Sequence, residues 1–260
     1  KPMCLLLVAL DTHPDYALVV AANRDEFHER AAAPADFWTD APDILGGRDL
    51  EGMGTWLAVN RRGAFAAITN VRVPGGALGT RSRGLIISDF LTDTRPPSPF
   101  VADLTATGRT YSGFNIIASQ GADLAWYSNF VDEHRTLGAG VYGLSNHLLD
   151  TPWPKVRSLK HAFDKLDVLP EDELVCALFD ALASEQAAPD PELPATGLDL
   201  AYERILSPIF INGDHYGTRC STVVLIDRHQ QLTFIERRFG PHKTFLGERT
   251  FRFEIDPGAT

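Results

Sequence analysis

Long apolar runs are missing from this sequence of 260 residues. No stretch reaches the roughly 18 consecutive apolar residues that mark a membrane-spanning helix. A charged-then-apolar leader with a small-residue cleavage site is not recognisable at the start either. Cysteine is scarce, and three cysteines at wide spacing do not suggest a disulfide framework, which fits a reducing compartment. We therefore expect a cytoplasmic protein.

Basic residues are outnumbered. The chain has 24 Lys and Arg against 34 Asp and Glu, a net charge of -10. Because like charges repel, this balance disfavours nonspecific binding to nucleic acid or to an anionic membrane. The sequence also has no P-loop, no dinucleotide fingerprint, no HExxH motif and no CxxC pair. We expect neither a nucleic-acid partner nor a metal centre, and the oligomeric state stays open.

Apolar runs separated by turn residues are what the sequence has in plenty. They predict four hairpins, at residues 3–10 with 16–22, 55–60 with 64–71, 111–118 with 124–130, and 220–227 with 231–239. Further strands are expected at 141–146 and, at a sheet edge, 251–255. The first hairpin is apolar nearly throughout, so its strands should be buried on both faces, as in a sheet covered on each side.

Helical spacing of apolar residues predicts helices at 83–92, 154–166 and 171–184, with a shorter one at 198–206. We interpret residues 30–50 as an irregular covering loop and residues 73–82 as a flexible, glycine-rich loop. Many hairpins with helices between them indicate an α+β fold whose antiparallel sheets are covered by helices. The hydrophobic content of 44% favours a single domain, which we place at residues 3–256.

Cys4 stands directly after Met3, at the beginning of the first apolar run. If translation starts at Met3 and this residue is removed, Cys4 carries a nucleophilic thiol together with an α-amine of pKa near ~8 that can act as its base. Lys1 and Pro2 look like a remnant of expression. While the residues ahead of Cys4 remain attached, its nitrogen is an amide, and we expect the chain to be catalytically silent.

An inert role is the alternative for each cysteine, because a free thiol commonly behaves as a small buried hydrophobe. We predict this role for Cys176, on the apolar face of a helix, and for Cys220, at the start of a strand. For Cys4 the position directly after a methionine favours catalysis, since only there can the amine of the same residue act as the base.

Four polar residues, Asn23, Arg24, Asp25 and Glu26, end the second strand. In an antiparallel hairpin the end of the second strand lies beside the beginning of the first, so we expect them next to Cys4. The charge of Arg24 would lower the pKa of the thiol, and Asp25 or Glu26 would hold the amine. The alternative is an ordinary solvated strand end.

Asn70 and Asn146 each follow an apolar run, and Arg219 precedes the last hairpin. Asparagine in such places is ordinarily a turn former. Two such amides would instead donate to the oxyanion of a tetrahedral intermediate, each contributing roughly 3 kcal/mol. Arg219 is either a surface ion-pair residue or a planar cation near the thiolate or a substrate carboxylate. Spacing alone does not choose between these roles.

Eight short motifs occur in order along the chain. They are Met3-Cys4, Ala21-Ala22-Asn23-Arg24-Asp25-Glu26-Phe27, Gly54-Thr55-Trp56-Leu57, Ala67-Ile68-Thr69-Asn70, Gly113-Phe114-Asn115, Tyr142-Gly143-Leu144-Ser145-Asn146, Thr151-Pro152-Trp153 and Tyr216-Gly217-Thr218-Arg219. This set closely resembles the NRDE family, named for its Asn-Arg-Asp-Glu motif and called the transport and Golgi organisation 2 proteins in animals. The resemblance covers residues 3–255.

The resemblance implies an N-terminal nucleophile (Ntn) hydrolase-like fold, a four-layer αββα sandwich of two antiparallel sheets. The chain is also similar to the cholylglycine hydrolase and penicillin acylase branch, which cleaves non-peptide amides with an N-terminal cysteine. Cys4, Arg24, Asn70, Asn146 and Arg219 look like the matching positions. The resemblance thus implies an amidase or acyl hydrolase that acts on a small-molecule C–N or acyl bond and requires no cofactor.

The site carboxylate stays open between two residues. The hydrolases carry Arg-Asn-x-Asp, whereas this chain has Asn23-Arg24-Asp25-Glu26. Either the arginine is shifted by one place or Glu26 replaces the aspartate, and a one-place shift reverses the face of a strand side chain.

A non-enzymatic function is the alternative that the resemblance implies. Members of the family have been connected with haem handling and with lipid or acyl-CoA homeostasis. The chain would then bind or carry haem or an acyl lipid on the same fold. A haem site needs an exposed Cys or His ligand in an apolar cleft, and no Cys-Pro pair is present in this sequence.

Overall fold

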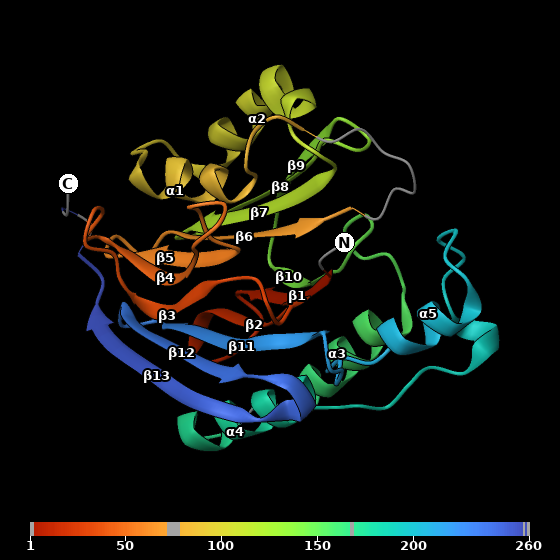
Figure 1. Ribbon diagram of the computed structural model, residues 1–260. Coiled ribbons are helices and arrows are strands. Elements are labelled where there is room, and N and C mark those ends of the chain that lie inside the picture. The colour runs from red at the N-terminus through yellow and green to blue at the C-terminus, as the bar shows by residue number, and fades with distance from the viewer. Residues whose placement is uncertain (1–2, 72–78, 167–168, 257, 259–260) are drawn as a thin grey trace.

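The computed structural model describes residues 3–71, 79–166, 169–256 and 258 (Figure 1). The proposed remnant Lys1 and Pro2 and most of the loop expected at 73–82 lie outside these residues. Within the described part, two antiparallel sheets face each other, and helices cover both outer faces. The chain therefore has the α+β fold that the sequence pattern predicts, in the four-layer αββα arrangement that the family resemblance implies.

The first and last strands of the described chain both belong to the first sheet. Its described strands run in the order β10 (Gly140–Leu144), β1 (Met3–Leu10), β2 (Tyr16–Phe27), β11 (Tyr216–Asp227), β12 (Gln231–Phe239) and β13 (Phe245–Glu254). Every neighbouring pair in it is antiparallel. The first and last predicted hairpins are confirmed, and the predicted strand at the sheet edge is β13, which begins earlier than expected.

The second sheet is a meander in chain order. Its described strands are β3 (Ala32–Phe37), β4 (Ile44–Asp49), β5 (Leu57–Asn60), β6 (Phe65–Asn70), β7 (Phe114–Gln120), β8 (Asp123–Ser128) and β9 (Glu133–Leu137). The predicted hairpins β5–β6 and β7–β8 both belong to it.

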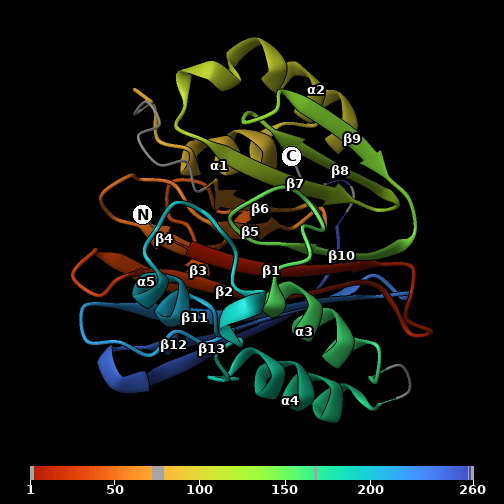
Figure 2. The ribbon, with the colours of Figure 1, turned by 90° about the vertical axis from the view of Figure 1, so that its right-hand side faces the viewer.

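The helices form the two outer layers, as the orthogonal view in Figure 2 also shows. α1 (Gly84–Thr92) and α2 (Pro97–Thr107) lie on the outer face of the second sheet, and α3 (Pro154–Phe163) and α4 (Glu171–Leu182) on that of the first. A shorter helix, α5 (Leu200–Leu206), precedes β11. Three 3-10 turns are described in addition, at Gly108–Thr110, Asp190–Glu192 and Pro241–Lys243.

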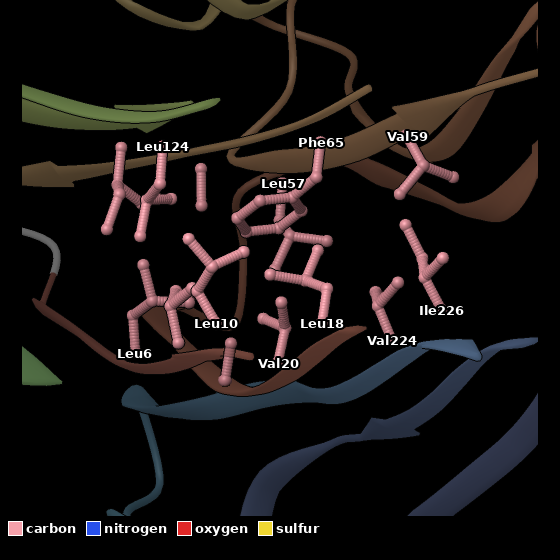
Figure 3. Packing of buried hydrophobic residues seen from close by; sticks show 14 of the residues in the cluster. Leu6, Leu10, Leu18, Val20, Leu57, Val59, Phe65, Leu124, Val224 and Ile226 are labelled. Carbon is pink, nitrogen blue, oxygen red and sulfur yellow. The ribbon is translucent and has the colours of Figure 1, made fainter. Parts of the chain in front are cut away.

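Strand β1 shows why its sequence is apolar without alternation. Leu6, Val8 and Leu10 pack between the two sheets, whereas Leu5 and Leu7 pack against the helices α3 and α4. Successive side chains of a strand point to opposite faces, and both faces are covered here. Figure 3 shows the inter-sheet core, where side chains from the two sheets point toward one another. Each fully buried leucine or valine contributes roughly 1.5–3 kcal/mol to the stability of the fold. A charged residue on either face of β1 would therefore disrupt the packing.

The covering loop predicted for residues 30–50 is wrong, because this segment forms the strands β3 and β4. Two features of the sequence explain why these strands were not predicted. β3 is an edge strand whose pairing is interrupted between Ala33 and Asp36, around Pro34, and edges and bulges are where proline is tolerated in sheets. β4 contains Gly46, where an added Cβ would lie 2.7 Å from the Cβ of Ala58. Close backbone packing, and not a turn, requires this glycine.

Two further elements were not expected from the sequence. No helix was predicted beyond residue 92 in this part of the chain, but Pro97 begins α2. A proline in the first turn needs no hydrogen bond from its missing N–H, and its fixed φ suits a helix start. Strand β9 was missed because Glu133–Leu137 is mostly polar and lies at the sheet edge.

The prediction of a core position for Cys176 is also wrong, because its side chain is exposed. The apolar stripe of α4 is formed by Leu174, Val175, Leu178 and Phe179. At about 100° per residue, position 176 falls on the opposite side of the helix from this stripe. Cys220, in contrast, is buried as predicted.

Candidate functional site

Cys4 lies at the beginning of β1 and lines a cleft of about 580 Å³ at one end of the sheet sandwich. Both sheets contribute to its walls, together with the segment 79–84 that leads into α1. The charged or aromatic residues that line it are Arg24, Glu26, Phe27, Arg30, Asp49, Glu51, Trp56, Arg81 and Arg83. The thiol at the head of the first strand thus opens onto a space in which a small molecule fits.

Arg24 lies directly across from Cys4 in the pairing of β1 with β2, as the sequence predicts. Its side chain is buried, and its guanidinium lies over the ring of Trp56 at 4.2 Å. Arg24 Nη2 donates to Asp49 Oδ2 at 3.3 Å and lies 3.8 Å from Glu26 Oε2. Stacking on one side and carboxylates on the other hold this cation beside the thiol.

The thiol of Cys4 is held in its protonated form. Burial raises the pKa of Cys4 to about 12, and the nearby negative charge of Asp25 adds to this effect. The positive charge of Arg24 and a hydrogen bond from the backbone N–H of Asp25 act in the opposite direction, without overcoming burial. With its nitrogen in a peptide bond, Cys4 is therefore a weak nucleophile at neutral pH, because the thiolate is the reactive species.

Asn146, in the loop after β10, holds the backbone nitrogen of Cys4. The N–H of Cys4 donates to Asn146 Oδ1 at 3.4 Å, and Asn146 Nδ2 donates to the backbone oxygen of Asn70 at 2.9 Å. Ser145 Oγ donates to the backbone oxygen of Cys4 at 2.9 Å. The amide of Asn146 is buried, so it fixes the start of β1 against the end of β6, where Asn70 lines the cleft.

The two candidate carboxylates lie on opposite faces of β2. Glu26 faces the cleft with Arg24, and its Oε2 lies 3.6 Å from Arg30 Nε. Asp25 faces the helical layer, where Asp25 Oδ1 accepts a hydrogen bond from Thr218 Oγ1 at 2.7 Å. Within the described residues, Asp25 Oδ2 is buried and has no hydrogen-bond partner. The sequence did not choose between these carboxylates, and the strand geometry gives them different surroundings.

Burial raises the pKa of Asp25 to about 6, against the positive charges of Lys155 and Arg24 and the hydrogen bond from Thr218. Lys155 projects from α3 and is itself buried. The charge of Asp25 acts on the Cys4 thiol more strongly than that of Glu26 does. Although Asp25 does not line the cleft, it is the carboxylate with the larger electrostatic influence on the thiol.

Arg219 lies on β11, and its guanidinium binds backbone oxygens of the chain that follows β2. Its Nη1 donates to the backbone oxygens of Phe27 at 2.7 Å and of Arg30 at 3.0 Å. It is not one of the described residues that line the cleft of Cys4. In this structure Arg219 ties down the chain that leaves β2.

Several site residues were missed by the sequence interpretation. Arg30 and Asp49, which are joined by hydrogen bonds at 2.7 Å and 3.1 Å, lie in the segment interpreted as a loop. Arg83 lies in the segment 79–84 and was assigned only to a helix start. The clustering of charged residues beside the glycines of 46–54 and 79–84 was the available signal for a cleft wall.

The described residues contain no group of three or more His, Cys, Asp or Glu side chains arranged to bind a metal ion. None of the helices described is both long and apolar enough to cross a membrane.

A family model and two related proteins carry the same description. A protein family described as Transport and Golgi organisation 2 matches residues 3–241. The mouse protein "Transport and Golgi organization 2 homolog" is 36% identical over 98% of this chain and 97% of its own. The cattle "Transport and Golgi organization protein 2 homolog" is 38% identical over 97% and 96%.

Among solved structures, the chain is similar to the Caenorhabditis elegans N-acylethanolamine-hydrolyzing acid amidase (NAAA) ortholog. The identity is 13% and the TM-score is 0.42, with 85% of this chain and 92% of that chain covered.

Proposed function

We propose that this chain, which belongs to the Transport and Golgi organisation 2 family, is an N-terminal-cysteine amidase or acyl hydrolase. Its activity would begin when the residues ahead of Cys4 are removed. One observation carries the proposal: the thiol of Cys4 lines a cleft while its nitrogen, the future α-amine, is held by the buried Asn146. Nucleophile and base would thus both be positioned by the fold.

The reaction would follow from the groups present. The free α-amine of Cys4 takes the thiol proton, and the thiolate attacks the carbonyl carbon of the substrate. The tetrahedral intermediate collapses to a thioester as the ammonium returns the proton to the departing amine or alcohol. Water then attacks the thioester, the amine again taking and returning a proton, which releases the acid and restores the thiol. Asn70, at the cleft, is our candidate to stabilise the oxyanion.

Removal of Met3 would also change the electrostatics of the site. Met3 is the residue that pairs with Asp25 across β1 and β2, so the new ammonium group would lie next to Asp25. The buried Oδ2 of Asp25, which lacks a partner among the described residues, suits this cation. A positive charge so close to the sulfur lowers the thiol pKa by direct attraction, in the same direction as Arg24. The roles of Asp25 and Glu26 would thus be to hold the amine and to orient Arg24, respectively.

The test compares a chain that begins at Cys4 with one that keeps Met3. Both are incubated with a panel of non-peptide amides and esters and with a thiol-directed electrophile, and adducts are mapped by mass spectrometry. We expect turnover and a rapid Cys4 adduct only for the chain that begins at Cys4. The exposed Cys176 and the buried Cys220 serve as internal controls for a reactive and a protected thiol. An unreactive Cys4 together with no hydrolysis in the processed chain would refute the proposal.

A non-catalytic binding function is our second candidate, for the unprocessed chain. It is supported by the cleft of about 580 Å³, a size that suits a small ligand, combined with a protonated thiol. The ligand would be an acyl lipid or haem. This candidate is tested by titration with haem and with a fatty acyl amide. Saturable binding to the Cys4→Ala variant as well as to the wild type supports a carrier function. The absence of both a Soret shift and saturable binding rejects the carrier function.

A further inference from the structure

Arg83 is a half-buried cation on the wall of the Cys4 cleft that the proposed chemistry does not use. Its Nη1 donates to the backbone oxygen of Gly113 at 3.1 Å. It forms no ion pair with any residue that the structure describes. Burial lowers the pKa of Arg83, and negative charge on Cys4 or Glu26 would act in the opposite direction. The guanidinium thus lies within electrostatic reach of the reacting thiol.

The other charges of the cleft largely satisfy one another. Asp49 accepts from both Arg30 and Arg24, Glu51 accepts from Arg30, and Glu26 lies between the same two arginines. These three carboxylates therefore balance the charges of Arg24 and Arg30. Two further cations line the cleft, the half-buried Arg83 and the exposed Arg81, which lies over the ring of Tyr111 at 5.5 Å. Arg83 is the less exposed of these two additional positive charges, in a protein whose net charge is -10. A half-buried cation without a compensating charge favours an anionic ligand.

The backbone next to Arg83 packs closely on residues 52–55. The N–H of Thr55 donates to the oxygen of Gly84 at 3.3 Å. An added Cβ on Gly54 would lie 2.2 Å from the carbonyl carbon of Gly84, and one on Gly52 would lie 2.9 Å from Ser82 Oγ. Two glycines thus let the segment that carries Arg83 pack directly on the chain entering β5, and these close contacts place the cation at the cleft wall.

We infer that the substrate of this cleft carries an anionic group, a carboxylate or a phosphate, which Arg83 binds while the acyl carbon lies at Cys4. This inference rests on the proposed hydrolase function and adds the substrate class to it. Guanidinium groups bind both kinds of anion through paired N–H donors. The remaining wall of the segment 79–84, with Thr80 and Ser82, offers hydroxyl groups to the same anion.

The test measures binding separately from turnover. The probes are anilides of short acyl chains, small enough for a cleft of about 580 Å³. Each chain ends in a carboxylate, a phosphonate or a methyl group. Affinities are measured calorimetrically on the Cys4→Ala variant, which cannot turn over. We expect at least one anionic end to bind about tenfold or more tightly than the methyl end. The anion that binds better shows whether the substrate carries a carboxylate or a phosphate.

Arg83→Gln should abolish this preference and Arg83→Lys should keep part of it. Arg109→Gln, an exposed arginine outside the cleft, should leave it unchanged. Equal binding of all three chain ends, or an anionic preference that survives in Arg83→Gln, would overturn the inference. A preference that depends on Arg83, found together with no hydrolysis by the chain beginning at Cys4, would uphold the anion site and reject the hydrolase.

Discussion

Cys4 and Arg24 face each other across the first two strands, and Arg24 in turn faces Cys220 on β11. One arginine therefore stands between a thiol that opens on a cleft and a thiol that is buried. Its charge lowers the pKa of both sulfurs, but burial outweighs it at each. The difference between the two cysteines lies in access to the cleft and in the nitrogen held by Asn146, and this difference makes Cys4 the candidate nucleophile.

The first prediction concerns the reactivity of Cys4 in the chain that keeps Met3. A thiol pKa of about 12 leaves about one molecule in 10⁵ as thiolate at neutral pH. Alkylation by iodoacetamide should accordingly be very slow at about pH 7 and should accelerate roughly tenfold per pH unit as the pH rises toward 10. The measurement is intact-mass kinetics in a Cys176→Ser background, because the exposed Cys176 would otherwise react first. A rate near that of a free thiol would contradict the protonated state.

Replacement of Arg24 should slow Cys4 further. Arg24→Gln removes the cation that lowers the thiol pKa, so the alkylation profile should shift to higher pH in the same Cys176→Ser background. Loss of the contacts with Trp56 and Asp49 should also cost about 1–3 kcal/mol of unfolding free energy. Arg62→Gln is a control outside the cleft, and its profile should match that of the parent. A faster Cys4 in Arg24→Gln would show that the arginine does not act on the thiol.

The third prediction concerns stability and Asp25. The pKa of Asp25 is raised from 3.8 to about 6 in the folded chain. The folded chain therefore holds the proton of Asp25 more tightly than the unfolded chain does. The stabilisation that results is fully present below pH 3.8 and is lost as the pH rises through about 6. Across this range the unfolding free energy should fall by about 3 kcal/mol from this group. Urea unfolding of Asp25→Asn, measured at several pH values, should lack this fall. The exposed Asp164 provides the control variant Asp164→Asn, which should behave as the wild type does.

Asn146 provides the fourth prediction. In the chain that begins at Cys4, Asn146→Ala removes the side chain that holds the α-amine, and kcat/KM should fall by about 10²-fold or more. Asn60 is a matched control, because it is buried, and its Nδ2 donates to the backbone oxygen of Leu91 on α1, away from the thiol. Asn60→Ala should lower the unfolding free energy while the activity per folded molecule stays unchanged. Equal losses of kcat/KM in the two variants would assign Asn146 a merely structural role.

The sequence predicted the pairing of Cys4 with the polar quartet, because an antiparallel hairpin necessarily brings its two open ends together. It could not assign Asp25 and Glu26 to their faces. In a strand that is buried on one side, the alternation of apolar and polar residues shows which side chains point to the core. Val19 and Val20 of β2 are both fully buried, so the sequence of this strand does not show which residues share a face. Arg83 was beyond prediction for a different reason, since its place on the cleft wall depends on contacts between segments far apart in the chain.

The cleft wall supplies the last prediction. Gly54→Ala would place a methyl group 2.2 Å from the carbonyl carbon of Gly84, so the segment carrying Arg83 must move away. The variant should lose about 1–3 kcal/mol of unfolding free energy in urea, and its anionic-probe affinity should fall toward that of the methyl-ended probe. Gly138→Ala is the control, because an added Cβ there meets no described atom within 4 Å and should change the stability by no more than about 0.5 kcal/mol. Unchanged probe affinity in a destabilised Gly54→Ala variant would separate the packing of these glycines from the placement of Arg83.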